Sequence, residues 1–152
     1  MIRKSITFEA AHQLETAFTA GCHECIHGHS YKVEILLTAD LLNEDKMVLD
    51  FSELKPIKDQ IMEGWDHGLI LHENKRAHIQ PLINAGVLKS SKVTFLNDNP
   101  TAETMARIVF TMVRDWLYRA QSRGWDLRGL RVYKVRIHET STGWAEYSQE
   151  GK

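Results

Sequence analysis

The sequence predicts a single α+β domain over residues 1–152, with elements in the order β-β-α-α-β-β. Two stretches of odd-even alternation near the N-terminus predict paired strands, and a third near the C-terminus predicts another. Between them, two segments carry apolar residues at helical spacing. A chain of 152 residues has the size of one ordinary domain, and no repeat or linker divides it.

Residues 6–12 alternate between a polar face and an apolar face that ends at His12. Residues 27–39 show the cleanest period-two pattern of the chain, with His27 and His29 on the apolar face. The segment between the two stretches is too short for a helical crossover with its turns. We therefore expect the two strands to pair antiparallel around a long hairpin loop.

An extended piece at 47–51 precedes the first expected helix, for which Ser52 is the predicted cap. Its apolar stripe consists of Leu54, Ile57 and Ile61, and a glycine at position 64 follows its end. Residues 72–92 are mixed, and the sequence does not explain their role. Within them the pattern favours a short helix around 78–85, and an extended stretch is expected to follow at 93–96.

The longest helix is expected to begin at Asn99 or Thr101 and to stop near Gly124. Its predicted core face consists of Met105, Ile108, Val109, Met112 and Trp116. A last strand follows over 130–139, and Glu139 ends its apolar face. A further extended segment is expected at 144–147.

Composition argues for a small-molecule partner. The chain has 19 basic and 20 acidic residues and a net charge of -1, so no overall field would attract nucleic acid or a membrane surface. The N-terminal residues lack the apolar stretch of a signal peptide, and no run approaches the ~20 apolar residues of a membrane span. These features predict a cytoplasmic protein.

Four of the eight histidines lie within residues 12–29. His27 and His29, two residues apart on a strand, project to the same side with side chains about 7 Å apart. His12 ends the core face of the neighbouring strand and can complete a triangle. Three imidazoles suit Zn²⁺ and leave a fourth position open, as in catalytic zinc sites. The sequence therefore predicts a Zn²⁺ site at these histidines.

Two other interpretations of this region stay open at this point. Cys22 and Cys25 have the C-x-x-C spacing of many zinc sites and could bind the metal with His27, although a fourth ligand, His23 or His29, is then needed. Alternatively, the three histidines are simply hydrogen-bonded strand residues. A thioredoxin-like role is the weakest, since that motif opens a helix in a βαβ unit.

Six motifs stand in order along about 140 residues: FEAAH, HGHSY, LDFSELK, WDHGLIL, NPTAE and IHETSTG. With them the chain resembles the 6-pyruvoyltetrahydropterin synthase superfamily, most closely its 6-carboxytetrahydropterin synthase branch, the QueD type. The resemblance implies a tunnelling fold, in which a four-stranded antiparallel sheet with two helices on one face forms a trimeric barrel. Trimers would stack into a hexamer, with active sites between subunits.

The resemblance also implies a substrate, 7,8-dihydroneopterin triphosphate. The QueD-like branch converts it to 6-carboxytetrahydropterin, with loss of acetaldehyde and triphosphate, on the route to queuosine. The sister branch forms the 6-pyruvoyl product instead. A non-catalytic module that binds zinc or a pterin is the alternative from a different functional class.

By their motif positions, His12, His27 and His29 would be the family's zinc ligands. A cysteine ahead of HGH would be the base, assisted by an Asp-His pair that corresponds to Asp66 and His67. Cys22 is the candidate, but it lies one position further from HGH than in the common QueD-type pattern. Cys25 and Glu24 are the alternatives.

Three acidic or hydroxyl side chains are implied as substrate ligands. Glu139 of the HET motif would accept two parallel hydrogen bonds from the pterin ring, which explains a carboxylate at the end of an apolar face. Thr101 and Glu103 of NPTAE would lie near the pterin pocket, although the same residues suit a helix N-terminus. No glycine-rich loop indicates where the triphosphate binds.

Overall fold

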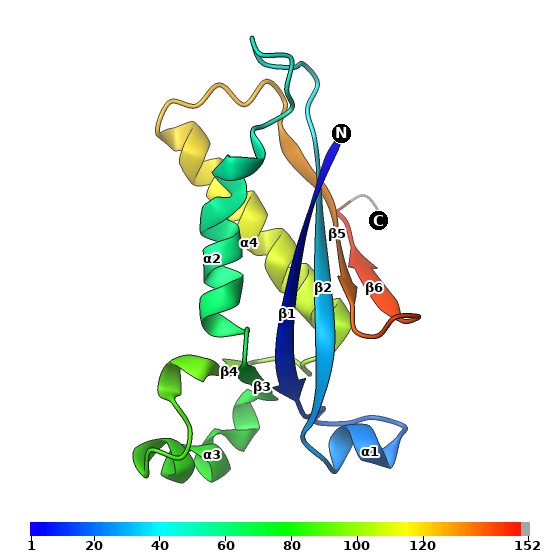
Figure 1. The fold of residues 1–152 in the computed structure, drawn as a ribbon, viewed down its shortest axis with the longest axis vertical. Helices are drawn as coiled ribbons and strands as arrows, with labels where there is room; N and C mark the ends of the chain where they lie inside the picture. The colour runs from blue at the N-terminus through cyan, green and yellow to red at the C-terminus, as the bar shows by residue number, and fades with distance from the viewer. Residues whose placement is uncertain (150–152) are drawn as a thin grey trace.

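A six-stranded mixed sheet forms the centre of the molecule, which a computed structural model describes over residues 1–149 (Figure 1). Residues 150–152 of the predicted domain lie outside the described part. The strand order is β4-β3-β1-β2-β5-β6. The strands are β1 (Ile2–His12), β2 (His27–Thr38), β3 (Gly68–His72), β4 (Val93–Leu96), β5 (Arg131–His138) and β6 (Trp144–Tyr147).

The predicted four antiparallel strands are present as β1, β2, β5 and β6, but the sheet is larger than predicted. β3 pairs parallel with the end of β1, and β4 pairs parallel with β3. The five-residue run of β3 has no alternation, because both of its faces are largely covered. The position of β3 beside β1 depends on pairing between residues far apart in the sequence, which a local sequence pattern does not predict.

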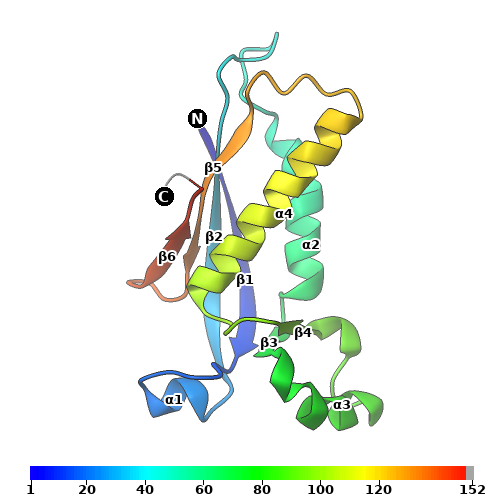
Figure 2. The ribbon, with the colours of Figure 1, turned by 180° about the vertical axis from the view of Figure 1, so that it is seen from behind.

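Four helices and three 3₁₀ turns connect the strands. They are α1 (Ala20–His23), α2 (Lys55–Gly64), α3 (Arg76–Asn84), α4 (Ala102–Ser122), η1 (Phe51–Leu54), η2 (Glu73–Lys75) and η3 (Ser90–Lys92). Helices α2 and α4 cover one face of the sheet, and α4 crosses in front of it in Figure 2. Among the helices of residues 1–149, none is long and apolar enough to cross a membrane.

The helix-covered face carries the hydrophobic core. The predicted stripe of α2 is buried, with Leu54, Ile57 and Ile61 at most 2% exposed. In α4 the predicted face was partly wrong: Phe110, Val113 and Leu117 are buried, whereas three of the five predicted residues are only partly buried. Helix α4 has apolar residues on a wide arc, so the sequence alone does not show which part of the arc meets the sheet.

The predicted helix caps are wrong for the first expected helix and confirmed for α4. Residues 47–51 were predicted to be extended, but a 3₁₀ turn begins at Phe51, and Asp50 rather than Ser52 caps it by accepting a 2.7 Å hydrogen bond from the Ser52 amide. Thr101 caps α4, as one of the two alternatives predicted, and accepts from the Thr104 amide.

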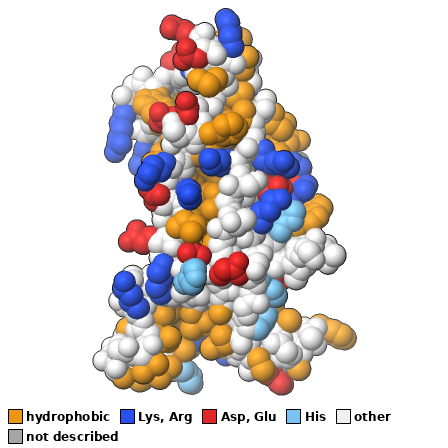
Figure 3. Space-filling model, in the orientation of Figure 1, with side chains coloured by type: hydrophobic (Ala, Val, Ile, Leu, Met, Phe, Trp, Pro, Cys, Tyr) orange, Lys and Arg blue, Asp and Glu red, His pale blue; other side chains and the backbone are white. Residues whose placement is uncertain are grey.

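The opposite face of the sheet, here called the open face, is covered by no helix of residues 1–149 (Figure 1). Figure 3 shows basic and acidic side chains intermixed across its middle. Glu34 of β2 forms ion pairs with several basic side chains of this face, and its own side chain is only 4% exposed. Lys32 lies 2.9 Å from its carboxylate, His138 3.2 Å and Arg3 3.4 Å. Although burial alone would raise the pKa of Glu34, these partners outweigh it and lower the pKa to about 2.

Replacing Glu34 by glutamine should therefore destabilise the fold by about 2 kcal/mol at neutral pH, a figure reduced for solvent screening because the side chains of Lys32 and Arg3 are 42% and 62% exposed. Because the pKa of Glu34 is lower in the folded protein, its ionised carboxylate contributes its full stabilisation at pH values above the ordinary pKa of 4.5. This contribution to the free energy of unfolding decreases as the pH falls toward 2. The difference between Glu34→Gln and the parent should thus shrink by roughly half near pH 3.

Urea unfolding at pH 7 and pH 3, at one fixed protein concentration, measures this difference. Glu44→Gln is the matched control, because Glu44 is exposed. A loss of the same size at both pH values would contradict the assigned ion cluster.

Candidate metal centre

The register of the β1–β2 hairpin brings the three predicted histidines together. His12 pairs directly with His27, and His29 pairs with Ala10, so all three side chains project from the helix-covered face at one end of the hairpin. Their ring centroids lie 4.6 to 5.2 Å apart. Within residues 1–149 they form a cluster whose possible ligand atoms all lie within 4.8 Å of one another.

Backbone carbonyls fix the tautomers of two of these rings. Nδ1 of His12 lies 2.8 Å from the Pro100 carbonyl oxygen, and Nδ1 of His27 lies 3.1 Å from that of Cys25. A carbonyl only accepts, so each Nδ1 must carry the proton and donate it. In the neutral ring, Nε2 then presents its lone pair, which is the arrangement that orients metal-binding histidines.

The two Nε2 atoms of His12 and His27 are 3.0 Å apart. Two lone pairs at this distance repel unless a cation, either a metal ion or an added proton, lies between them. Two nitrogens bound to one tetrahedral zinc ion at ~2.0–2.1 Å would be roughly 3.3 Å apart, close to the observed spacing. The donor set therefore fits zinc without rearrangement of the strands.

Burial favours the neutral, metal-binding form of His12. Its side chain is 1% exposed, and this burial lowers the pKa of His12 more than the Pro100 carbonyl and Glu139 raise it. A metal ion therefore has little competition from protons at this nitrogen at neutral pH.

Glu139, the predicted pterin ligand, lies beside the histidine cluster, and its contact with substrate stays a prediction. Its Oε1 is 3.5 Å from Nε2 of His12 and accepts a 3.3 Å hydrogen bond from the hydroxyl of Tyr31. Tyr31 was not predicted as a site residue, although its position on the histidine face of the second strand could have indicated it. Burial and the Glu139 charge raise the pKa of Tyr31, so its phenol stays protonated and donates.

Asp66 and His67 form the predicted hydrogen-bonded pair. The pair lies beside β1, just before β3 begins. Asp66 accepts hydrogen bonds from Nδ1 of His67 (2.9 Å) and from the amide of Glu9 (3.1 Å). His67 has a left-handed backbone, with φ of 53°, and its side chain is 78% exposed. It borders a hollow of about 460 Å³ that Glu9 and Ser30 of the open face and His29 of the histidine cluster also line, and no residue of the 13–26 segment lines that hollow.

The two cysteines lie in the hairpin loop, where α1 was not predicted. Cys22 is on α1 and half-buried, while Cys25 is exposed. Neither thiol belongs to a cluster of three or more metal-ligating side chains within residues 1–149. The alternative of a zinc site built from both cysteines and His27 is thus not supported.

Thr101 and Glu103 occupy the start of α4. The Thr101 hydroxyl oxygen accepts from the Thr104 amide at 3.3 Å, and the exposed carboxylate of Glu103 lies in the first turn, where it stabilises the helix dipole. The stability of the helix N-terminus is therefore a sufficient reason for both residue types at these positions. Their contact with substrate stays a prediction.

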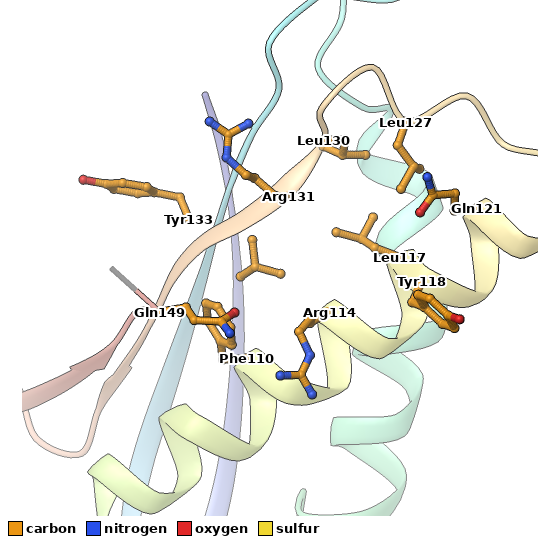
Figure 4. A pocket seen from close by; sticks show the side chains of 11 residues that line it. Phe110, Arg114, Leu117, Tyr118, Gln121, Leu127, Leu130, Arg131, Tyr133 and Gln149 are labelled. Carbon is orange, nitrogen blue, oxygen red and sulfur yellow. The ribbon is translucent and has the colours of Figure 1, made fainter. Parts of the chain in front are cut away.

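A separate cavity of about 400 Å³ lies between the C-terminal half of α4 and β5, at the far end of the sheet from the histidines (Figures 1 and 4). Its arginines already have partners, since Arg131 donates to Asp40 at 2.7 Å and Arg114 to Asp115 at 3.0 Å. No histidine, cysteine or carboxylate of the described chain lines this cavity. It is therefore distinct from the metal centre.

Comparison with known proteins gives a consistent result. The family model of 6-pyruvoyl tetrahydropterin synthase matches residues 1–150. A relative from Aquifex aeolicus, named 6-carboxy-5,6,7,8-tetrahydropterin synthase, is 30% identical over 98% of this chain and 98% of its own length. A relative of the same name from Rickettsia bellii is 35% identical over 94% of this chain and 96% of its own length.

Solved structures share the fold. An uncharacterised protein from Wolinella succinogenes superposes with a TM-score of 0.78 at 20% identity, covering 98% of this chain and 97% of that one. The Caenorhabditis elegans 6-pyruvoyl tetrahydropterin synthase does so with a TM-score of 0.63 at 21% identity, covering 98% and 94%. Because the family model spans nearly the whole sequence and full-length relatives reach 35% identity, this chain belongs to the 6-pyruvoyl tetrahydropterin synthase family.

Proposed function

We propose that this chain is a zinc-dependent 6-carboxy-5,6,7,8-tetrahydropterin synthase of queuosine biosynthesis, acting in the cytoplasm. The observation that carries the proposal is the three-histidine cluster with the Glu139 carboxylate 3.5 Å from His12. The relatives with this name support the branch. The proposed reaction is the lysis of 7,8-dihydroneopterin triphosphate to 6-carboxytetrahydropterin, acetaldehyde and triphosphate.

His12 and His27 would hold the zinc ion through their Nε2 atoms, and His29 through one of its ring nitrogens. When bound, the ion would supply Lewis-acid polarisation of the substrate's side chain. Glu139 would accept two hydrogen bonds from the edge of the pterin ring, and Tyr31 keeps that carboxylate in place by donating to it. Together these groups would fix the substrate between a ring anchor and a metal.

Removal of a proton from the substrate side chain requires a base, for which Cys22 is our first candidate. It lies on α1 in the loop that joins the two histidine-bearing strands. Cys25 is the less favoured thiol, because it is exposed and its carbonyl oxygen accepts from His27. Glu24, which is also exposed, is the remaining alternative.

We further propose that the sites are completed between subunits of a homo-oligomer, a trimer or a dimer of trimers. On β1, strand β3 pairs only with residues 10–12, so within the described chain residues 2–9 are left as a sheet edge. β6 forms the opposite edge and runs antiparallel to β1. Edges of this kind can join in a closed ring. His67, exposed beside β1, would then serve the histidine cluster of a neighbouring subunit.

Mixing two inactive variants tests this arrangement. If Cys22 and His67 of one site come from different subunits, co-expression of Cys22→Ala with His67→Ala in equal amounts should restore about a quarter of the parent activity, the statistical share of sites with both residues intact. Each variant alone should show almost none. Complete inactivity of the mixed oligomers would place both residues of a site in one subunit.

Product analysis tests the function as a whole. The zinc-loaded protein is incubated with 7,8-dihydroneopterin triphosphate, and the products are identified by mass. We expect acetaldehyde and 6-carboxytetrahydropterin. Formation of a pyruvoyl pterin would instead assign the sister activity, and unchanged substrate would indicate a module that only binds.

A further inference from the structure

The loop that carries Cys22 is held by a side chain from a distant part of the chain. Asn99, which is half-buried, uses both ends of its amide: Oδ1 accepts from the Glu15 amide at 2.6 Å, and Nδ2 donates to the Thr16 carbonyl at 2.9 Å. Such a two-point contact restrains both the position and the direction of the loop backbone. We call these contacts the Asn99 clamp.

Contacts within the loop carry this restraint to Cys22. The Leu14 amide donates to the Cys22 carbonyl at 2.9 Å, and the Gln13 side chain donates to the His23 carbonyl at 2.7 Å. Leu14 is the direct neighbour of the clamped Glu15. The backbone of Cys22 is therefore one hydrogen bond and one residue away from the clamp.

A second contact joins the same point of the loop to η2. The Glu15 carboxylate accepts from the Asn74 side chain at 2.6 Å and lies 3.5 Å from Nζ of Lys75. Its Oε2 is buried and makes no hydrogen bond in the described chain, so the Lys75 charge is what compensates it. Both partners belong to the segment 72–92, whose role the sequence does not explain.

The residue after Asn99 orients the metal centre. The Pro100 carbonyl accepts from Nδ1 of His12, and Thr101 then caps α4. The tripeptide 99–101 thus contacts both His12 and the start of the cysteine loop. A shift of this tripeptide would move Cys22 relative to the histidines.

We propose that Asn99 is a positioning residue that holds Cys22 in register with the three-histidine cluster, and that Asn74 and Lys75 give the segment 72–92 the same task through Glu15. This inference rests on the proposed function, in which Cys22 is the base. Asn99 itself touches no reacting atom.

Two substitutions of Asn99 and one control test the proposal. Asn99→Leu removes both hydrogen bonds at similar volume, and Asn99→Asp keeps the acceptor for the Glu15 amide while losing the donor to Thr16. We expect Asn99→Leu to lower kcat about 100-fold with little change in KM or zinc content, since a displacement of ~1 Å has this effect. Asn99→Asp should fall between it and the parent. Asn97→Leu, at an exposed neighbouring position, should be unaffected.

A second readout does not depend on the enzyme activity. The alkylation rates of Cys22 and Cys25 by iodoacetamide are compared by peptide mass spectrometry in the zinc-loaded proteins. Release of the clamp should raise the rate at half-buried Cys22 at least about fivefold and leave exposed Cys25 unchanged. This result would support the clamp even if the parent protein formed no lyase product, which would overturn the proposed function alone.

Two results would overturn the inference. One is an unchanged kcat and an unchanged Cys22 rate in a folded Asn99→Leu protein. The other is a loss of activity in proportion to lost zinc, which would assign Asn99 to the metal centre through Pro100 rather than to the loop. If Asn99→Leu fails to fold, the same comparisons are decided by Asn99→Asp.

Discussion

Replacing His29 by alanine is expected to reduce the bound zinc of the purified protein to about a tenth or less and the lyase activity at least about 1000-fold. The reason is that within residues 1–149 the proposed site consists of three side chains, so loss of one would leave two protein ligands. Lewis-acid stabilisation contributes several kcal/mol to such reactions, and each ~1.4 kcal/mol corresponds to a tenfold rate. Elemental analysis and product formation measure the two effects.

His78→Ala is the control for this prediction. His78 lies exposed on α3, away from the cluster, so its loss should change neither zinc content nor rate. The fold of His29→Ala should persist, because His29 is at the end of the hairpin and only half-buried. Full zinc occupancy in a folded His29→Ala protein would mean that the ion binds elsewhere.

Replacing Cys22 by alanine should lower kcat by about 1000-fold while leaving zinc content unchanged, because general-base catalysis typically contributes 10²–10⁴. Steady-state kinetics with 7,8-dihydroneopterin triphosphate, together with elemental analysis, tests both parts. The combination separates the loss of a base from the loss of the metal, which His29→Ala produces.

Cys25→Ala and Glu24→Gln are the matched variants for the second prediction. Each removes a neighbouring candidate base from the same loop, and each should retain kcat within about threefold of the parent. A large loss in one of these two, with Cys22→Ala nearly active, would transfer the role of base to that residue.

The histidine site could be predicted from the sequence because it depends on one local rule. Alternation along β1 and β2 placed the three imidazoles on one face, and the short connection indicated antiparallel pairing, which the observed register of His12 with His27 confirms. Capping chemistry restricted the start of α4 to two candidates, and the structure selects Thr101 rather than Asn99 as the cap.

Features that depend on long-range contacts could not be predicted. β3 has no alternation, and its parallel pairing with β1 is what places His67 at the open face. Asn99 was considered only as a helix cap, since its contacts with Glu15 and Thr16 join residues more than 80 positions apart. The spacing of residues in the sequence does not predict side-chain hydrogen bonds between such distant positions.

X-ray absorption at the zinc edge of the full-length protein tests the central claim most directly. If three imidazoles hold the ion, the first shell consists of nitrogen and oxygen atoms at about 2.0–2.1 Å, with the multiple scattering of three imidazole rings and no sulfur. Sulfur neighbours at about 2.3 Å would instead assign the ion to Cys22 and Cys25, and a protein that binds no zinc would contradict the metal centre altogether.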